Sequence, residues 1–113
     1  MSPLTTHVLD TFRGVPATGL AVTLEKGQGK EWKRLAAGHT DNDGRLRQLL
    51  PDGSLLSAGV YRLTFETGAY FKAAGVKHFF PSVTVTFETA ETAAHLHVPL
   101  LLSPYGYSTY RGT

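Results

Sequence analysis

The sequence predicts an all-β sandwich of about eight strands with one short helix, on the basis of three observations. Apolar and polar residues alternate in short segments, as in Val83-Thr84-Val85-Thr86-Phe87, which places the apolar side chains on one face of a strand. Clusters of Gly, Pro, Asn and Asp separate these segments. The segments also recur at the short spacing that is typical of a β-sandwich.

Eight segments follow the strand pattern. They lie near residues 4–9, 19–26, 31–38, 45–49, 60–66, 82–88, 94–102 and 106–111. Turns are predicted at Lys26-Gly27-Gln28-Gly29, Asp43-Gly44, Pro51-Asp52-Gly53 and Pro104-Tyr105-Gly106, where the residue types favour tight changes of direction.

One segment, at about 68–75, breaks the alternation and is predicted to be a short helix. We expect Thr67 to cap its start and Gly75 to end it. Tyr70, Ala73 and Ala74 are expected to share its inner face.

Length and composition indicate one soluble domain over residues 1–113. The chain has the size of a single domain, and its 42% hydrophobic residues suffice for a core. The lack of Cys excludes a thiolate nucleophile and a Cys-ligated metal. The sequence has neither a secretory signal nor an apolar run near the roughly 18 residues of a membrane helix, so we expect a cytoplasmic protein. A net charge of +2, with scattered Lys and Arg, argues against a nucleic-acid partner.

Three of the five histidines fall in strand patterns that suggest a polar face. His7 shares a face with Thr5 and Leu9. His95 and His97 point away from the core, because the core face of their strand is formed by Ala94, Leu96, Val98 and Leu100. For a histidine considered alone, a surface or core-edge position is the more common interpretation.

A metal site is one alternative for these histidines. His95 and His97 have the spacing of metal ligands, and His7 would complete a three-His zinc site with an open position for water. No motif carboxylate stands beside them as a second partner or general base, and no HExxH helix is present. We therefore predict no metal, and leave adventitious binding at His95 and His97 open.

The predicted turn at Asp41-Asn42-Asp43-Gly44 sets the position of Arg45. Its spacing does not continue as a calcium loop, so it is interpreted as a tight turn that places Arg45 at the start of a strand, facing a cleft. Arg47 lies on the same face, and two solvated arginines are the simpler alternative. No Gly-x-Ser-x-Gly motif is present. The remaining groups, His, Arg and hydroxyls, suit activation of water and stabilisation of an oxyanion.

The last 14 residues, 100–113, continue as an apolar, Tyr-rich strand, hairpin and strand. Terminal segments usually fray, so this one is expected to be held in place. Because a small core cannot cover all of it, we expect another subunit to bury the exposed patch and sheet edge.

Several of these segments together resemble one family. They are Leu4-Thr5-Thr6-His7-Val8-Leu9-Asp10-Thr11, Gly14-x-Pro16-Ala17, Thr40-x-x-Asp43-Gly44-Arg45, His95-x-His97-x-Pro99-Leu100-Leu101-Leu102-Ser103-Pro104 and Tyr110-Arg111-Gly112-Thr113. The sequence resembles the 5-hydroxyisourate hydrolases, the transthyretin-related enzymes of purine degradation, over essentially its whole length. The resemblance implies a transthyretin-like (prealbumin-like) Greek-key sandwich, assembled as a homotetramer, a dimer of dimers, whose central channel holds the sites.

The resemblance also implies the site residues and the reaction. His7, Arg45 and His97 would be catalytic, and His7, Arg45, Tyr110, Arg111, Gly112 and Thr113 would bind substrate. The implied reaction opens the six-membered ring of 5-hydroxyisourate to 2-oxo-4-hydroxy-4-carboxy-5-ureidoimidazoline, without metal or cofactor. Position 113 is Thr where the family most often has Ser; the hydroxyl is kept, but the added methyl would crowd the pocket. The alternative function is a transthyretin-type carrier of small ligands.

Overall fold

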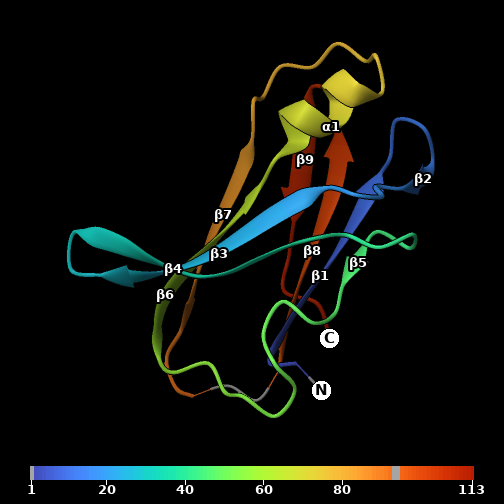
Figure 1. Cartoon of the computed structure of the whole chain (residues 1–113). Helices are drawn as coiled ribbons and strands as arrows, with labels where there is room; N and C mark the ends of the chain where they lie inside the picture. Colours follow the sequence, from blue (N-terminus) through green and yellow to red (C-terminus); the bar gives the residue numbers. More distant parts are fainter. Residues whose placement is uncertain (1, 93–94) are drawn as a thin grey trace.

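The computed structural model describes residues 2–92 and 95–113, which form two β-sheets that enclose one core (Figure 1). In the first sheet, β1 (Leu4–Asp10) is central. On one side it pairs in parallel with β8 (Leu96–Ser103), which in turn pairs with β9 (Gly106–Thr109). On its other side it pairs antiparallel with β2 (Val15–Pro16) and β5 (Arg45–Leu46).

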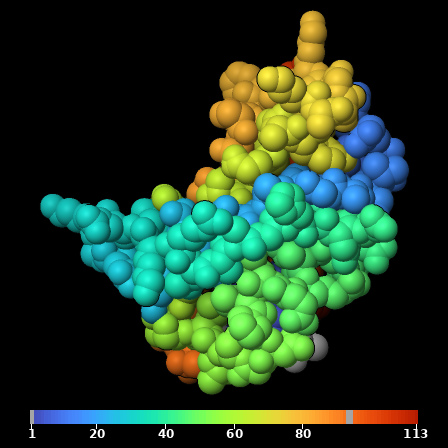
Figure 2. Space-filling model, viewed as in Figure 1, coloured from blue at the N-terminus to red at the C-terminus, as the bar shows by residue number. Residues whose placement is uncertain are grey.

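The second sheet is antiparallel, with the strand order β4-β3-β6-β7. Its strands are β3 (Ala21–Gln28), β4 (Glu31–His39), β6 (Gly59–Phe65) and β7 (Val83–Thr89). The hairpin of β3 and β4 projects from the body of the molecule (Figure 2). The helix α1 (Thr67–Ala73) lies at one end of the sandwich, and the start of β1 and the C-terminus lie toward the other end (Figure 1). Within the described residues, no helix is long and apolar enough to cross a membrane.

The core lies between the inner faces of the two sheets. Leu4 and Val8 of β1 are fully buried, as are Leu24 of β3 and Leu63 and Phe65 of β6. Alternating burial along β1 and β6 shows that the period-two pattern selects the buried face. The predicted two-sheet sandwich is therefore confirmed.

Most strand boundaries lie within two residues of the predicted ones, and three differences are larger or of another kind. The predicted strand 45–49 pairs only at Arg45–Leu46. The two-residue β2 was not predicted, because two residues are too few to show alternation. The strand β3 continues through Gln28, so the turn falls at Gly29 and Lys30 rather than at residues 26–29, with Gly29 at a φ of 64°. Ala94, predicted to face the core, lies outside the described residues.

The predicted helix is present, but its start and inner face differ from the prediction. Thr67 does not cap the helix; it is the first helical residue, buried with Gly68 and Phe71. Because residues spaced by three or four lie on one face, this turn of the helix buries Phe71 and leaves Ala73 and Ala74 exposed. Gly75, at a φ of 70°, ends the helix as predicted: its N–H donates to the Lys72 carbonyl.

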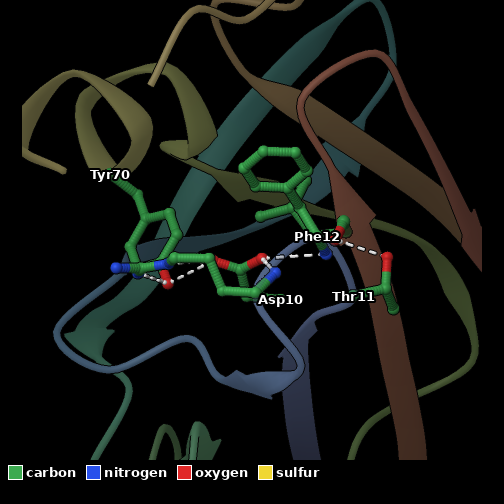
Figure 3. A network of polar contacts seen from close by, with 6 residues as sticks. Asp10, Thr11, Phe12 and Tyr70 are labelled. Carbon is green, nitrogen blue, oxygen red and sulfur yellow. Dashed lines mark hydrogen bonds and ion pairs between the residues drawn. The ribbon is translucent and has the colours of Figure 1, made fainter. Parts of the chain in front are cut away.

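A buried polar network joins α1 to the end of β1 (Figure 3). The Asp10 carboxylate accepts hydrogen bonds from the backbone N–H groups of Phe12 and Arg13 through Oδ1. Its Oδ2 accepts from Arg13 Nε at 3.0 Å and from the Tyr70 hydroxyl at 2.8 Å. Burial opposes ionisation of Asp10, but these hydrogen bonds outweigh it and hold the pKa of Asp10 below its usual value.

The C-terminal segment is held in place, as predicted. After β9, Gly112 returns to β8, where its N–H donates to the His97 carbonyl at 2.8 Å. Thr109 also donates through its hydroxyl to the Pro99 carbonyl at 2.7 Å. The chain end therefore lies against the strand that carries His97.

Candidate active site

The outward face of β1 carries Thr5 and His7, as the alternation predicts. Both side chains are partly exposed, whereas Leu4, Thr6 and Val8 are buried. His7 lies opposite Arg45 of β5, and Thr5 lies opposite His97 of β8. Pairing of β1 with β5 on one side and β8 on the other thus brings together residues that are far apart in the sequence.

The His97 ring is held by Thr5, and its pKa is lowered. Its Nδ1 lies 2.8 Å from the Thr5 hydroxyl, and the ring is partly buried. Burial lowers the pKa of His97, and the positive charges of Arg45, His7 and His95 lower it further. A neutral imidazole has a lone pair, so His97 is suited to accept a proton near pH 7.

The His7 ring is held by the backbone of the turn that precedes β5. Its Nε2 lies 2.8 Å from the Asp43 carbonyl oxygen. Because a carbonyl oxygen only accepts, this contact assigns the proton of a neutral His7 to Nε2 and leaves the lone pair on Nδ1. His7 therefore also presents a nitrogen that accepts a proton.

The two arginines of this region differ in their partners. Arg47 donates through Nη1 to Asp41 Oδ2 at 3.0 Å, and its Nη2 lies 3.8 Å from Asp43 Oδ2. In contrast, within residues 2–92 and 95–113 no hydrogen bond or ion pair holds the Arg45 guanidinium. Arg45 is thus available to bind a carbonyl oxygen or an anion.

A cleft of about 410 Å³ joins several of these groups. Its lining includes Thr5, Arg45, Arg47, His97 and Thr113. Arg45 and Arg47 share this cleft, as their predicted common face requires. His7 does not line it, but His7 is the cross-strand neighbour of Arg45 and contributes to the lowered pKa of His97. Three of the predicted catalytic or binding residues, Arg45, His97 and Thr113, therefore share one cavity.

The other residues of the C-terminal signature lie on the far side of His97. Tyr110 and Arg111 line a second cavity of about 790 Å³, which also contacts Phe87 and Glu88 near the end of β7. His95 and His97 line both cavities. Gly112 packs against the His97 ring, where a Cβ atom would approach Cδ2 to 2.5 Å. In one protomer, His97 thus separates Tyr110 and Arg111 from Arg45.

Two contacts of the site were not predicted as functional. The Thr5 hydroxyl contacts His97 across 92 positions of sequence, and the Asp43 carbonyl contacts His7. The two-residue alternation of a strand places Thr5 on the same face as His7, so the sequence did indicate that Thr5 lies near the site. The Asp43 carbonyl leaves no side-chain signal, because any residue supplies a backbone oxygen.

The three-His zinc alternative has no assembled ligand set in the part of the chain that the structure describes. No three His, Cys, Asp or Glu side chains among those residues are arranged to hold a metal ion. The Nδ1 of His95 instead lies 3.1 Å from the Ser2 carbonyl oxygen, and that of His97 contacts Thr5.

The fold and this cluster define a transthyretin-like β-sandwich with a His–Arg–His face. The model of the HIUase/Transthyretin family matches residues 4–112, and the chain belongs to this family. Among solved structures, the chain is similar to the 5-hydroxyisourate hydrolase of Klebsiella pneumoniae, with a TM-score of 0.85 and 39% identity over 97% of this chain and 98% of that one. It is also similar to transthyretin from Sparus aurata, with a TM-score of 0.90 and 32% identity over 99% and 97%.

Sequence similarity to curated relatives is higher. The chain is 47% identical to a protein of Salmonella typhimurium named 5-hydroxyisourate hydrolase. The 110 aligned residues cover 97% of this chain and 80% of that protein. It is 45% identical over 114 residues to the mouse protein of the same name, covering 99% and 96%. The backbone therefore fits both the hydrolases and transthyretin, while the identities are greater with the hydrolases.

Proposed function

We propose that this chain is a 5-hydroxyisourate hydrolase of urate degradation, with residues 1–113 forming one hydrolase domain. The identities of 45% and 47% with proteins of that name, over nearly the whole chain, support the proposal. The observation that carries it is the convergence of His7, Arg45 and His97 on one face of the first sheet.

The proposed chemistry uses an imidazole as the base. Neutral His7 or His97 accepts a proton from water while the water oxygen forms a bond to the ring carbonyl carbon of 5-hydroxyisourate. The ring C–N bond then breaks, and the departing nitrogen takes a proton from an imidazolium. Such a base typically contributes about 10²- to 10⁴-fold to the rate. Either histidine is a candidate, because each ring has one nitrogen in a hydrogen bond. His97 accepts through Nε2 when its Nδ1–H donates to the Thr5 hydroxyl.

Arg45 is proposed to stabilise the oxyanion that forms on the attacked carbonyl. Its guanidinium lines the cleft beside His97 and has no carboxylate partner among the described residues. Loss of one such donor typically costs about 3 to 4 kcal/mol of transition-state stabilisation. We also propose that Tyr110, Arg111, Gly112 and Thr113 take part in binding the substrate.

We propose that the protein works as a homotetramer, a dimer of dimers, in the cytoplasm. Phe79, Tyr105 and Tyr107 are exposed by 72%, 68% and 44% in the single chain, and β9 forms an edge of its sheet. Burial of this aromatic surface and sheet edge against further copies would remove both liabilities. A monomeric mass in light scattering at micromolar protein would contradict the tetramer.

A transthyretin-type carrier is the second candidate, because of the TM-score of 0.90 with a transthyretin. A carrier would retain a small ligand stoichiometrically without converting it. A zinc hydrolase would lose activity with chelator. The three differ in one measurement: the ultraviolet decay of freshly generated 5-hydroxyisourate, with and without chelator.

The expected result is decay whose rate rises linearly with protein over many turnovers and is unchanged by chelator. A decay that stops at one equivalent of ligand per site, or no acceleration over buffer, would contradict the hydrolase. Heat-inactivated protein controls for spontaneous decay of the substrate.

A further inference from the structure

The turn of residues 41–44 contacts both His7 and the strand that carries Arg45. The Oδ1 atom of Asp41 accepts hydrogen bonds from the backbone N–H of Asp43 at 2.8 Å and of Arg45 at 3.0 Å. The Asp41 backbone closes the turn: its N–H donates to the Arg45 carbonyl, and its carbonyl accepts from Gly44. One carboxylate oxygen thus binds both the middle of the turn and the first residue of β5.

The other carboxylate oxygen of Asp41 holds Arg47. Asp41 Oδ2 accepts from Arg47 Nη1 at 3.0 Å. This ion pair neutralises one of the two arginines that line the cleft and leaves Arg45 as the unpaired one among the described residues. The backbone N–H of Arg45 contributes most to the lowered pKa of Asp41, so Asp41 is ionised at neutral pH.

The turn is also fixed against β1, so its carbonyl oxygens do not move freely. The Gly44 carbonyl accepts from the Val8 N–H at 2.8 Å. Gly44 has a φ of 75°, and a Cβ there would collide with the Val8 carbonyl oxygen. In this frame, the adjacent Asp43 carbonyl lies 2.8 Å from His7 Nε2.

We propose that Asp41 is a positioning residue of the active site, which through its turn orients His7 and sets the start of the strand bearing Arg45. This inference rests on the proposed hydrolase function for its kinetic consequences. Asp41 does not touch substrate; it acts through the Asp43 carbonyl, which fixes the proton of His7 on Nε2, and through the Arg45 backbone.

Two substitutions separate the turn contacts from the charge. Asp41→Ala removes both carboxylate oxygens. Asp41→Asn keeps an amide oxygen that accepts from the two backbone N–H groups, but gives up the charge facing Arg47. We expect Asp41→Ala to lower kcat about 10- to 100-fold, as small misplacements of reacting groups do, and Asp41→Asn to recover most of that loss. Glu25→Ala, which removes a carboxylate paired with Arg62 on the other sheet, is the matched control.

A second measurement does not depend on activity. In ¹⁵N-labelled protein, the ring nitrogens of His7 report by NMR which one carries the proton. We expect the Nε2–H form in the wild type and in Asp41→Asn, and a mixture of both tautomers in Asp41→Ala. This readout remains informative if the protein does not hydrolyse 5-hydroxyisourate, so failure of the two proposals can be distinguished.

Two outcomes would overturn the positioning role. One is an Asp41→Ala protein whose His7 tautomer and kcat match the wild type. The other is an Asp41→Asn protein as impaired as Asp41→Ala in both measurements, which would assign the effect to charge rather than to the turn. Circular dichroism and the oligomeric mass of each variant identify any protein that fails to fold. If Asp41→Ala fails to fold, Asp41→Asn and Asp41→Ser, which both keep a short acceptor without the charge, carry the test. Both should keep the Nε2–H form of His7, and its loss in both would overturn the positioning role.

Discussion

The polar side chains in the two halves of β1 differ in how completely they are hydrogen-bonded. At its end, buried Asp10 has both oxygens occupied by Phe12, Arg13 and Tyr70. Near its middle, His7 is held through one nitrogen, and its neighbour Arg45 has no partner for its guanidinium among the described residues. A fully satisfied network stabilises the fold, whereas groups left partly unsatisfied retain the capacity to bind and react.

This contrast also separates a buried face from an exposed one. Asp10 belongs to the same inward series as Leu4 and Val8, so it tolerates no missing hydrogen bond. His7 and Thr5 belong to the outward series, where water and substrate can reach them. A single strand therefore supplies both a structural anchor and part of the proposed site, and substitutions on its two faces should have different consequences.

Arg45→Ala should produce the largest change in activity. We expect turnover to fall about 10²-fold or more, because the oxyanion loses its donor, while the free energy of unfolding stays near that of the wild type. Steady-state kinetics and urea unfolding measure the two quantities. Arg47→Ala is a useful comparison, since its guanidinium is already paired with Asp41. A near-normal rate for Arg45→Ala would remove its role.

The activity should fall at acid pH, in a range that depends on Arg45. Because burial and the charge of Arg45 lower the pKa of His97, its neutral form persists below the usual value of about 6.5. If His97 is the base, the fall in kcat/KM is centred on a pH below 6.5, and well below the lowered pKa it reaches about tenfold per pH unit. In Arg45→Gln the drop should begin at a higher pH. A fall in kcat/KM centred at or above pH 6.5 in the wild type, or an unchanged pH dependence in Arg45→Gln, would contradict His97 as the base.

Asp10→Ala should mainly change stability. The substitution removes four hydrogen bonds and leaves the Tyr70 hydroxyl without its acceptor, so we expect a loss of about 3 kcal/mol in the free energy of unfolding. The activity per folded site should stay within about twofold, because the network lies away from the cleft. Urea unfolding at fixed protein concentration and kinetics at low temperature measure these effects. An equal loss of activity and stability would remove the distinction between the two ends of β1.

The Asp10 contribution should itself depend on pH. Its pKa is lower in the folded protein than in the unfolded chain, so ionised Asp10 stabilises the fold fully above about pH 4. The difference in stability between the wild type and Asp10→Ala should shrink as pH falls through that lowered pKa. A difference that is the same at pH 3 and pH 7 would contradict this account.

Thr5→Val should have a moderate effect on the site. Valine has the shape of threonine and suits a strand, but it lacks the hydroxyl that lies 2.8 Å from His97 Nδ1. Loss of one hydrogen bond, worth about 0.5 to 1.5 kcal/mol, should lower kcat up to about tenfold with little change in KM. Thr5→Ser keeps the hydroxyl and should remain close to the wild type. Equal kcat values for Thr5→Val and the wild type would show that Thr5 does not orient His97.

The sequence predicts faces and turns better than it predicts contacts. Alternation was sufficient to place Thr5 and His7 together on one face, which the structure shows to be the outward one, and the turn before Arg45 followed from Asp and Gly. The pairing of Thr5 with His97 depends on the register of β1 against β8, which no local pattern specifies. The family resemblance named His97 as a site residue, but not the hydroxyl that holds it.

Two structural predictions failed for related reasons. The strand 45–49 was predicted from its residue pattern, yet pairing with β1 stops at Leu46, and the side chain of the next residue, Arg47, binds Asp41 of the preceding turn. Thr is a residue type that often caps helices, but Thr67 is itself the first helical residue, and its side chain is buried. In both cases the tertiary arrangement overrode a local preference that was correctly recognised.

The smallest predicted change in stability concerns Thr67, in the helix that also carries Tyr70 of the Asp10 network. Its hydroxyl is buried and has no hydrogen-bond partner in the described residues, unlike the Tyr70 hydroxyl one turn later in α1. Thr67→Val replaces this hydroxyl with a methyl of similar size, so we expect the free energy of unfolding to rise by about 1 kcal/mol, with unchanged activity. Urea unfolding beside Thr86→Val, an exposed control on β7, isolates the buried hydroxyl. A loss of stability in Thr67→Val would mean that the hydroxyl has a hydrogen-bond partner, such as a bound water. The buried polar groups at this end of the sandwich would then be satisfied at Thr67 as they are at Asp10.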